Sequence, residues 1–149
     1  MKYIALMLVL ASVISATAYN NTLSGSQTAA PEAEGIALNL TAAGDLPGMT
    51  KVSLHREGGN VTGGSLRLTV LPQHADASSS ERGQLVGTIS GGTVTLNSEG
   101  TLSSASGVQV TIQSGTGEFA SVTSGTATLN ITASSENPTQ LSGTLVLNF

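Results

Sequence analysis

The sequence predicts an all-β protein: a single eight-stranded antiparallel β-barrel, with a β-sandwich as the alternative, behind an N-terminal signal-peptide helix. From residue 35 onward, apolar and polar residues alternate with a period of two, which puts the apolar side chains on one face of each strand. Gly and Pro interrupt this alternation at short intervals, as is typical of tight turns. No window of about 11 residues or more beyond the leader has helical periodicity. Short strands with short turns and no helices indicate a closed barrel or a sandwich.

Residues 1–18 have the three parts of a secretory signal peptide. Lys2 supplies the positive charge, residues 4–11 form a short apolar run, and Ala16-Thr-Ala18 supplies the small residues before a cleavage site. A membrane anchor needs roughly 20 apolar residues, and polar residues interrupt this run earlier. We therefore expect cleavage after Ala18, contact with the membrane only through the signal peptide, and a secreted or periplasmic protein.

Residues 19–34 have no sustained period and end in a stretch rich in Pro, Ala and Glu. Such a stretch is typical of a linker or of a loosely attached N-terminal strand. The sequence leaves both possibilities open, and it places the β-barrel domain in residues 35–149.

The expected strands follow from the alternation, and the expected turns from Gly and Pro. The strands are 36–41, 49–56, 65–70, 84–90, 93–97, 108–114, 123–132 and 140–149. The turns are the Gly-Gly pairs at 58–59, 63–64 and 91–92, together with residues 45–48 and 136–138. The alternation directs one set of large side chains into the barrel: Leu38, Leu54, Leu68, Leu96, Val110 and Leu147.

The composition excludes several classes of protein. Only 9% of the residues are charged, against about 25% in an ordinary domain, so Thr, Ser and Asn must cover the outer faces of the strands. There is no cysteine, which excludes disulfides and cysteine-based metal or redox sites, and for an exported protein favours a bacterial source. Removal of the leader leaves four basic residues against nine acidic ones, so we expect no nucleic-acid partner. Those four are Lys51, Arg56, Arg67 and Arg82.

A small cluster of cationic and titratable residues supplies the candidate binding site. Lys51, Ser53 and His55 share one face of a predicted strand, and the turn expected near residues 58–64 returns Arg67 toward them. Arg is a bidentate donor to carboxylates and His titrates near neutral pH, so Lys51, His55 and Arg67 are candidates for an anion or carboxylate pocket that takes a small acid. The alternative is a solvated polar face with no ligand.

Neither a catalytic residue nor a metal or cofactor site is assigned from the sequence. There is no Gly-x-Ser-x-Gly motif, and the two histidines and the scattered carboxylates have no metal-ligand spacing. Residues 115–120 match the letters of a dinucleotide fingerprint, but that motif needs a helix, and β-branched residues and Gly follow here.

Residues 115–129 carry a resemblance to a known family. They read Gly-Thr-Gly-Glu-Phe-Ala-Ser-Val-Thr-Ser-Gly-Thr-Ala-Thr-Leu. This stretch resembles the Gly-x-Gly-x-aromatic-Ala-x-x-x-Gly-x-Gly/Ala pattern of the allene-oxide-cyclase and dirigent-like barrel proteins, which include many bacterial secreted proteins. The resemblance implies an eight-stranded antiparallel barrel with this stretch as a late hairpin. It also implies cyclisation of a fatty-acid epoxide or steering of phenoxy-radical coupling inside the barrel, although no catalytic residue of the family matches a position here.

Taken together, these features predict an exported, non-catalytic β-barrel module that binds a small apolar ligand or a surface partner. The alternative is a lyase- or isomerase-like enzyme of the allene-oxide-cyclase or dirigent type, acting in the barrel cavity. A third possibility is an assembly or adhesion component that uses the Ser- and Thr-rich strand faces. The interior distinguishes the first two, because an enzyme of this type needs a cavity that large side chains leave open.

Overall fold

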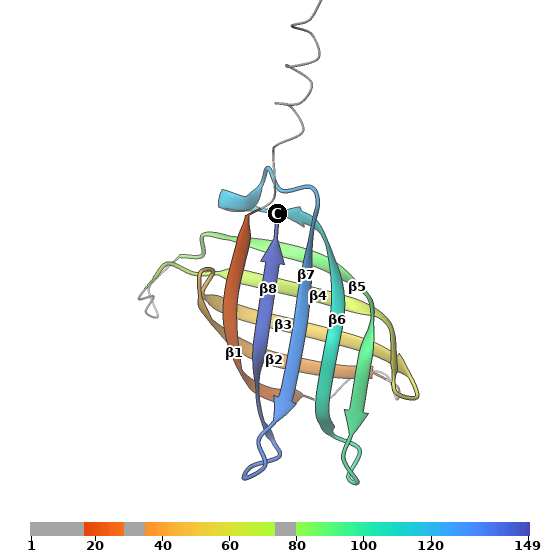
Figure 1. The fold of residues 1–149 in the computed structure, drawn as a ribbon. Coiled ribbons are helices and arrows are strands. Elements are labelled where there is room, and N and C mark those ends of the chain that lie inside the picture. Colours follow the sequence, from red (N-terminus) through yellow and green to blue (C-terminus); the bar gives the residue numbers. More distant parts are fainter. Residues whose placement is uncertain (1–16, 29–34, 74–79) are drawn as a thin grey trace, which may run out of the picture.

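The computed structural model describes residues 17–28, 35–73 and 80–149 of the chain. It contains eight strands and one turn of 3-10 helix, η1: β1 (Ala18–Thr28), β2 (Gly35–Gly44), β3 (Gly48–Glu57), β4 (Asn60–Val70), β5 (Gly83–Leu96), β6 (Leu102–Gly115), η1 (Gly117–Phe119), β7 (Gly125–Ala133) and β8 (Gln140–Asn148). Each strand pairs antiparallel with the next, and β8 pairs with β1, so the sheet closes into a barrel (Figure 1). The predicted eight-stranded antiparallel barrel is confirmed, and the sandwich alternative is wrong because the ring of pairing is continuous. Within the described ranges, no helix has the length and apolar character needed to cross a membrane.

Residues 18–28, which the sequence left between a linker and a loosely attached strand, form β1. This strand pairs along most of its length with β2 on one side and β8 on the other; Thr22, for example, lies opposite Ala43 and Thr144. One residue before β1, the backbone of Thr17 exchanges two hydrogen bonds with Phe149, with N···O distances of 3.0 and 3.2 Å. The barrel therefore begins upstream of residue 35, and β1 supplies its closing strand.

Two of the three Gly-Gly pairs are not the turns that the sequence predicted. Gly91 and Gly92 lie inside β5, where the pairing with β6 shifts register on both sides of Gly91, so the strands expected at 84–90 and 93–97 are one bulged strand. Gly64 lies inside β4 with a φ of 137°, and a Cβ there would overlap the backbone of the neighbouring strand. Only the pair at 58–59 makes a hairpin turn, between β3 and β4. The total is still eight strands, because two predicted strands form the single strand β5, and β1, which precedes the predicted barrel domain, is added.

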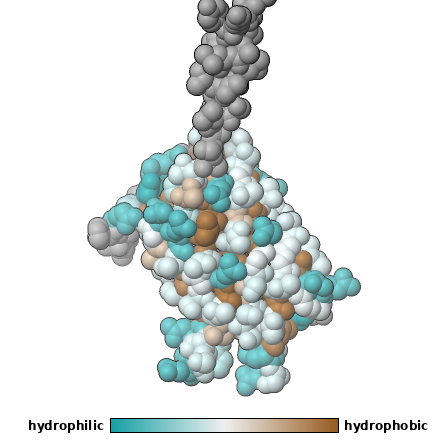
Figure 2. Space-filling view, in the orientation of Figure 1, coloured by the Kyte–Doolittle hydropathy of each residue, from teal (hydrophilic) through white to brown (hydrophobic). Residues whose placement is uncertain are grey.

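The interior of the barrel is packed with aliphatic side chains. The following have no accessible surface, so no water molecule fits beside them: Leu40, Leu54, Leu68, Val70, Leu102, Val108, Leu129, Leu145 and Leu147. Of the residues predicted to point inward, Leu96 is only half-buried, because it lies at the end of β5; the others are buried. The outer wall is neutral and polar: over β1, β8, β7 and β6 most of the surface in Figure 2 is white, the colour of intermediate hydropathy that Thr and Ser share.

Candidate functional site

Two cations lie side by side on the outer wall of the barrel. Lys51 on β3 and Arg67 on β4 are directly opposite each other in the pairing register, and both side chains are exposed. Directly opposite residues have Cβ atoms roughly 5 Å apart. Neither side chain forms an ion pair or a hydrogen bond with the described parts of the chain. The other six strands contain no Asp, Glu, Lys or Arg, so this pair is a local positive charge in a neutral wall.

A shallow hollow of about 180 Å³ lies between these two cations. Ser65, Leu66 and Val86 complete its lining, and Val86 is the cross-strand partner of Arg67 on β5. Like charges directly opposite each other on a sheet are destabilising. A bound anion would replace that repulsion by two attractions, so the geometry is suited to a carboxylate or a similar group.

The structure keeps His55, the third predicted site residue, away from this hollow. His55 shares the outward face of β3 with Lys51 but is four residues further along, which corresponds to roughly 13 Å. Its cross-strand partners are Gly35 on β2 and Gly63 on β4, and it has an interaction of its own. The structure thus brings Lys51 and Arg67 together and leaves His55 outside their site.

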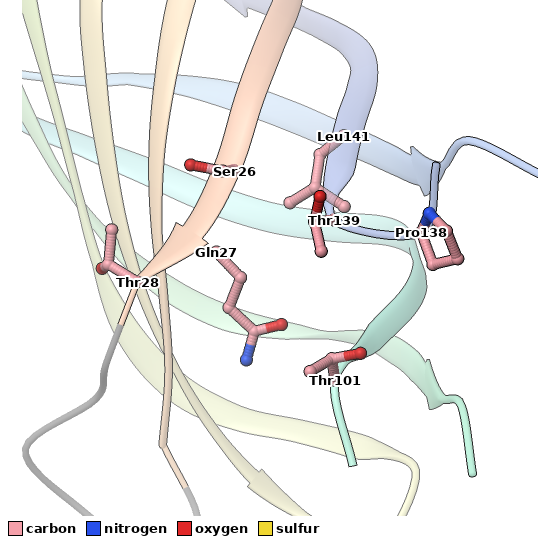
Figure 3. Close-up of a pocket in the computed structure, with 7 residues that line it drawn as sticks. All are labelled: Ser26, Gln27, Thr28, Thr101, Pro138, Thr139 and Leu141. Atoms are coloured by element: carbon pink, nitrogen blue, oxygen red, sulfur yellow. The ribbon is translucent and has the colours of Figure 1, made fainter. Parts of the chain in front are cut away.

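A second hollow lies at the end of the barrel where β1 ends and β8 begins. It has a volume of about 230 Å³, and Figure 3 shows seven residues around it: Ser26, Gln27, Thr28, Thr101, Pro138, Thr139 and Leu141. Gln27 reaches from β1 toward β6, where its Oε1 accepts a hydrogen bond from the Leu102 backbone amide at 2.8 Å. We call this hollow the mouth pocket.

The opposite end of the barrel holds the three aromatic residues of the described chain. Tyr19 and Phe149 stack with ring centroids 4.6 Å apart, and Phe119 meets Phe149 edge to face at 6.2 Å. Phe119, in η1, is buried and lies under the guanidinium of Arg82. Arg82 makes two hydrogen bonds to Glu118, of 3.0 and 3.2 Å, and this contact lowers the pKa of the Glu118 carboxyl. The cluster closes this end of the barrel.

Sequence reasoning missed Gln27 and Asn21, the latter a buried polar residue of β1. Gln27 contacts a residue 75 positions away, and no local spacing reports such a contact. Asn21 left a weak signal, since Asn21 and Leu23 alternate with the polar residues Thr22 and Ser24. The absence of a longer period in residues 19–34 hid that signal.

A substrate inside the barrel would have to displace core side chains. Leu54 on β3, Leu68 on β4, and Leu145 and Leu147 on β8 are fully buried in the interior of the barrel. The neighbouring cations point outward from the same strands. Comparisons with known protein families, with curated proteins and with solved structures found no match. A ligand or partner can therefore bind without rearrangement of the core only on the outer wall or at the two ends of the barrel.

Proposed function

We propose that this protein is an exported, non-catalytic binding module that holds a carboxylate-bearing partner against the outer wall of its barrel. The observation that carries the proposal is the Lys51–Arg67 pair, two adjacent cations without an acidic partner in the described chain. Like charges directly opposite each other on a sheet reduce stability. A carboxylate in the hollow between them removes that cost.

The two side chains have complementary roles in such a site. The planar guanidinium of Arg67 donates two parallel hydrogen bonds to a carboxylate, while the ammonium of Lys51 supplies a mobile point charge. The half-buried side chain of Val86 accommodates the carbon skeleton next to the carboxylate. The formal net charge of the whole chain is −4, so an acidic partner is repelled elsewhere and is oriented toward this pair.

The packed interior favours a surface partner over a ligand or substrate enclosed by the barrel. A ligand pocket for a drug-sized molecule has roughly 300–1,000 Å³, and the inward side chains of β3, β4 and β8 leave no room for a water molecule. The outer wall needs no rearrangement to bind a partner. The barrel then serves as a rigid support for groups on its outside.

The binding test is an NMR titration of ¹⁵N-labelled protein at low salt. The probes are citrate and polygalacturonate, with dextran as the neutral control. We expect shifts centred on Lys51, Arg67 and Val86 that disappear as salt is added, because exposed charges are screened. Lys51→Gln and Arg67→Gln should each weaken binding severalfold. Arg56→Gln, which removes one positive charge near the end of β3, is the matched control and should retain binding.

Two outcomes would overturn this proposal. One is that neither acidic probe shifts the resonances around Lys51 and Arg67. The other is that Arg56→Gln weakens binding as much as Arg67→Gln, because the probes would then respond only to total charge.

A charge reversal at Lys51 tests whether Lys51 and Arg67 repel each other in the folded protein. Lys51→Glu places a carboxylate opposite Arg67, and we expect it to raise the free energy of unfolding by roughly 0.5–1 kcal/mol at low salt while abolishing binding of citrate. Urea denaturation followed by circular dichroism measures the change. A loss of stability would contradict the cross-strand pairing that the site requires.

Export is tested by the mass of the protein recovered outside the cytoplasm. We expect its first residue to be Tyr19, and Ala18→Leu should leave the leader attached, because a large residue does not fit where the small residue is needed. Ala18 is exposed in the structure, so its substitution spares the core. Recovery of the full chain with its leader inside the cell would contradict export.

A further inference from the structure

We infer that the mouth pocket binds a neutral ring compound with several hydroxyl groups, of the kind that a saccharide unit presents. This site is separate from the Lys51–Arg67 pair and does not depend on it. Its residues come from three stretches of the chain: the end of β1, the turn before β6, and the start of β8 with the turn before it (Figure 3). Convergence of three stretches around one hollow gives it walls on several sides.

The size of the mouth pocket fits one ring rather than an extended molecule. Its volume of about 230 Å³ is below the roughly 300–1,000 Å³ that is usual for drug-sized ligands. Pro138 and Leu141 supply an aliphatic surface on one side. The C–H groups of a saccharide ring match such a surface.

The polar groups of the pocket select a neutral ligand. No lining residue is charged, so an ionised ligand loses hydration and gains no counter-charge. The Nε2 of Gln27 offers donors, and four hydroxyl side chains line the pocket. Three of these hydroxyls already form a hydrogen bond within the protein and offer a ligand only their remaining capacity. The hydroxyl groups of a ligand can both accept from Gln27 Nε2 and donate to the lining oxygens, whereas a wholly apolar ligand leaves Gln27 Nε2 unpaired. The four hydroxyl side chains belong to Ser26, Thr28, Thr101 and Thr139.

Gln27 is held in position before any ligand arrives. Its Oε1 accepts the Leu102 amide at 2.8 Å, and Leu102 is buried, so releasing this bond would leave a buried N–H unpaired. The Nε2 of Gln27 forms no hydrogen bond with the described chain. An anchored amide with free donors loses little conformational entropy on binding. For one saccharide unit in a pocket of this size we expect a Kd in the millimolar range.

The test is an NMR titration that follows the Gln27 side-chain amide and the backbone amides of Thr101 and Thr139. The probes are glucose, galactose, mannose and N-acetylglucosamine, up to roughly 100 mM, which is about 100 times a millimolar Kd. Cyclohexanol tests a ring of similar shape with a single hydroxyl, and glucuronate tests the effect of charge. We expect saturable shifts with at least one neutral saccharide and at least tenfold weaker binding of cyclohexanol and glucuronate.

Two conservative variants assign the effect to the pocket. Gln27→Glu keeps the acceptor for the Leu102 amide but removes both Nε2 donors and adds a charge, so affinity should fall at least tenfold. Thr139→Val removes one exposed hydroxyl, which also donates to Asn137 Oδ1 at 2.7 Å, and should weaken binding about three- to tenfold. Gln109→Glu, on the exposed wall of β6, makes the same chemical change as the first variant and should bind like the wild type.

The inference is overturned if none of the four neutral saccharides shifts the Gln27 amide, or if cyclohexanol binds as tightly as they do. It is also overturned if Gln109→Glu and Gln27→Glu weaken binding equally. Lys51→Gln should not affect saccharide binding, so failure at the mouth pocket and failure at the cation pair can be told apart.

Discussion

Asn21 should be among the polar residues on which the fold depends most. Its side chain is 3% exposed, its Nδ2 donates to the Leu46 carbonyl at 2.8 Å, and its Oδ1 accepts from the Leu46 amide at 2.9 Å. These bonds attach the β2–β3 turn to β1, and Leu46 is itself buried in the core. Asn21→Ala leaves both backbone groups of Leu46 without these partners.

The expected cost of Asn21→Ala follows from those two groups. A buried donor or acceptor without a partner costs about 1–3 kcal/mol, and some water can enter the space left by the side chain, so we expect a total of roughly 2–4 kcal/mol. That is a large part of a typical stability of about 5–15 kcal/mol, and it corresponds to a fall in Tm of roughly 5–15 °C.

Urea denaturation followed by far-UV circular dichroism measures this cost, with Asn20→Ala as the matched control. Asn20 is the preceding residue, is exposed, and has no side-chain hydrogen bond within the described ranges. Asn20→Ala should therefore change stability by less than about 0.5 kcal/mol. Asn21→Asp keeps the acceptor but sets a carboxylate oxygen against the Leu46 carbonyl, so its stability should improve as the pH falls and the carboxyl is protonated. The reasoning is refuted if Asn21→Ala costs no more than Asn20→Ala.

Three further predictions concern the core, the bulged wall and the closed end of the barrel. Thr50 is fully buried and its hydroxyl has no hydrogen-bond partner, so Thr50→Val should raise the free energy of unfolding by about 1–2 kcal/mol in urea titrations; a decrease would contradict the packing. Gly64→Ala should destabilise strongly in thermal melts, since its Cβ would overlap a strand carbonyl, whereas Gly91→Ala meets open space and should cost little. Because Arg82 lowers the pKa of Glu118, this contact adds stability above the unfolded carboxyl pKa and loses it as the pH falls through the lower folded value. Glu118→Gln should remove that part of the acid sensitivity in urea midpoints measured from about pH 3 to 6; an unchanged pH profile would contradict it.

The sequence predicts the fold class well because alternation is a local signal, and the chain from residue 35 onward carries it in strand after strand. The alternation of Leu66 and Leu68 with Arg67 fixes which side chain faces outward without any knowledge of the neighbouring strand. Glycine is less informative, because the same residue serves a hairpin turn at Gly58 and a bulge at Gly91. Which role a glycine has depends on whether the neighbouring strand continues to pair past it, and the local sequence does not show this.

For the candidate sites too, contacts between residues close in sequence could be predicted, and contacts between distant residues could not. The juxtaposition of Lys51 and Arg67 could be predicted because a single hairpin connects their strands. The alternation places His55 on the same face of β3 as Lys51, but four residues along the strand separate the two side chains. The mouth pocket could not be predicted, since Gln27 lies in the first strand and Thr139 in the turn before the last strand, and the two come together only when the barrel closes.

The pairing of β1 with β8 makes closure of the barrel depend on the last strand of the chain. These two strands are joined by the contact of residues such as Thr22 and Thr144, which are separated by nearly the whole chain, so the barrel cannot close until β8 is available. Until then β1 exposes an unpaired edge, and it has no Lys, Glu or Pro of the kind that discourages pairing with other chains. We therefore expect a chain that lacks β8 to associate through this edge.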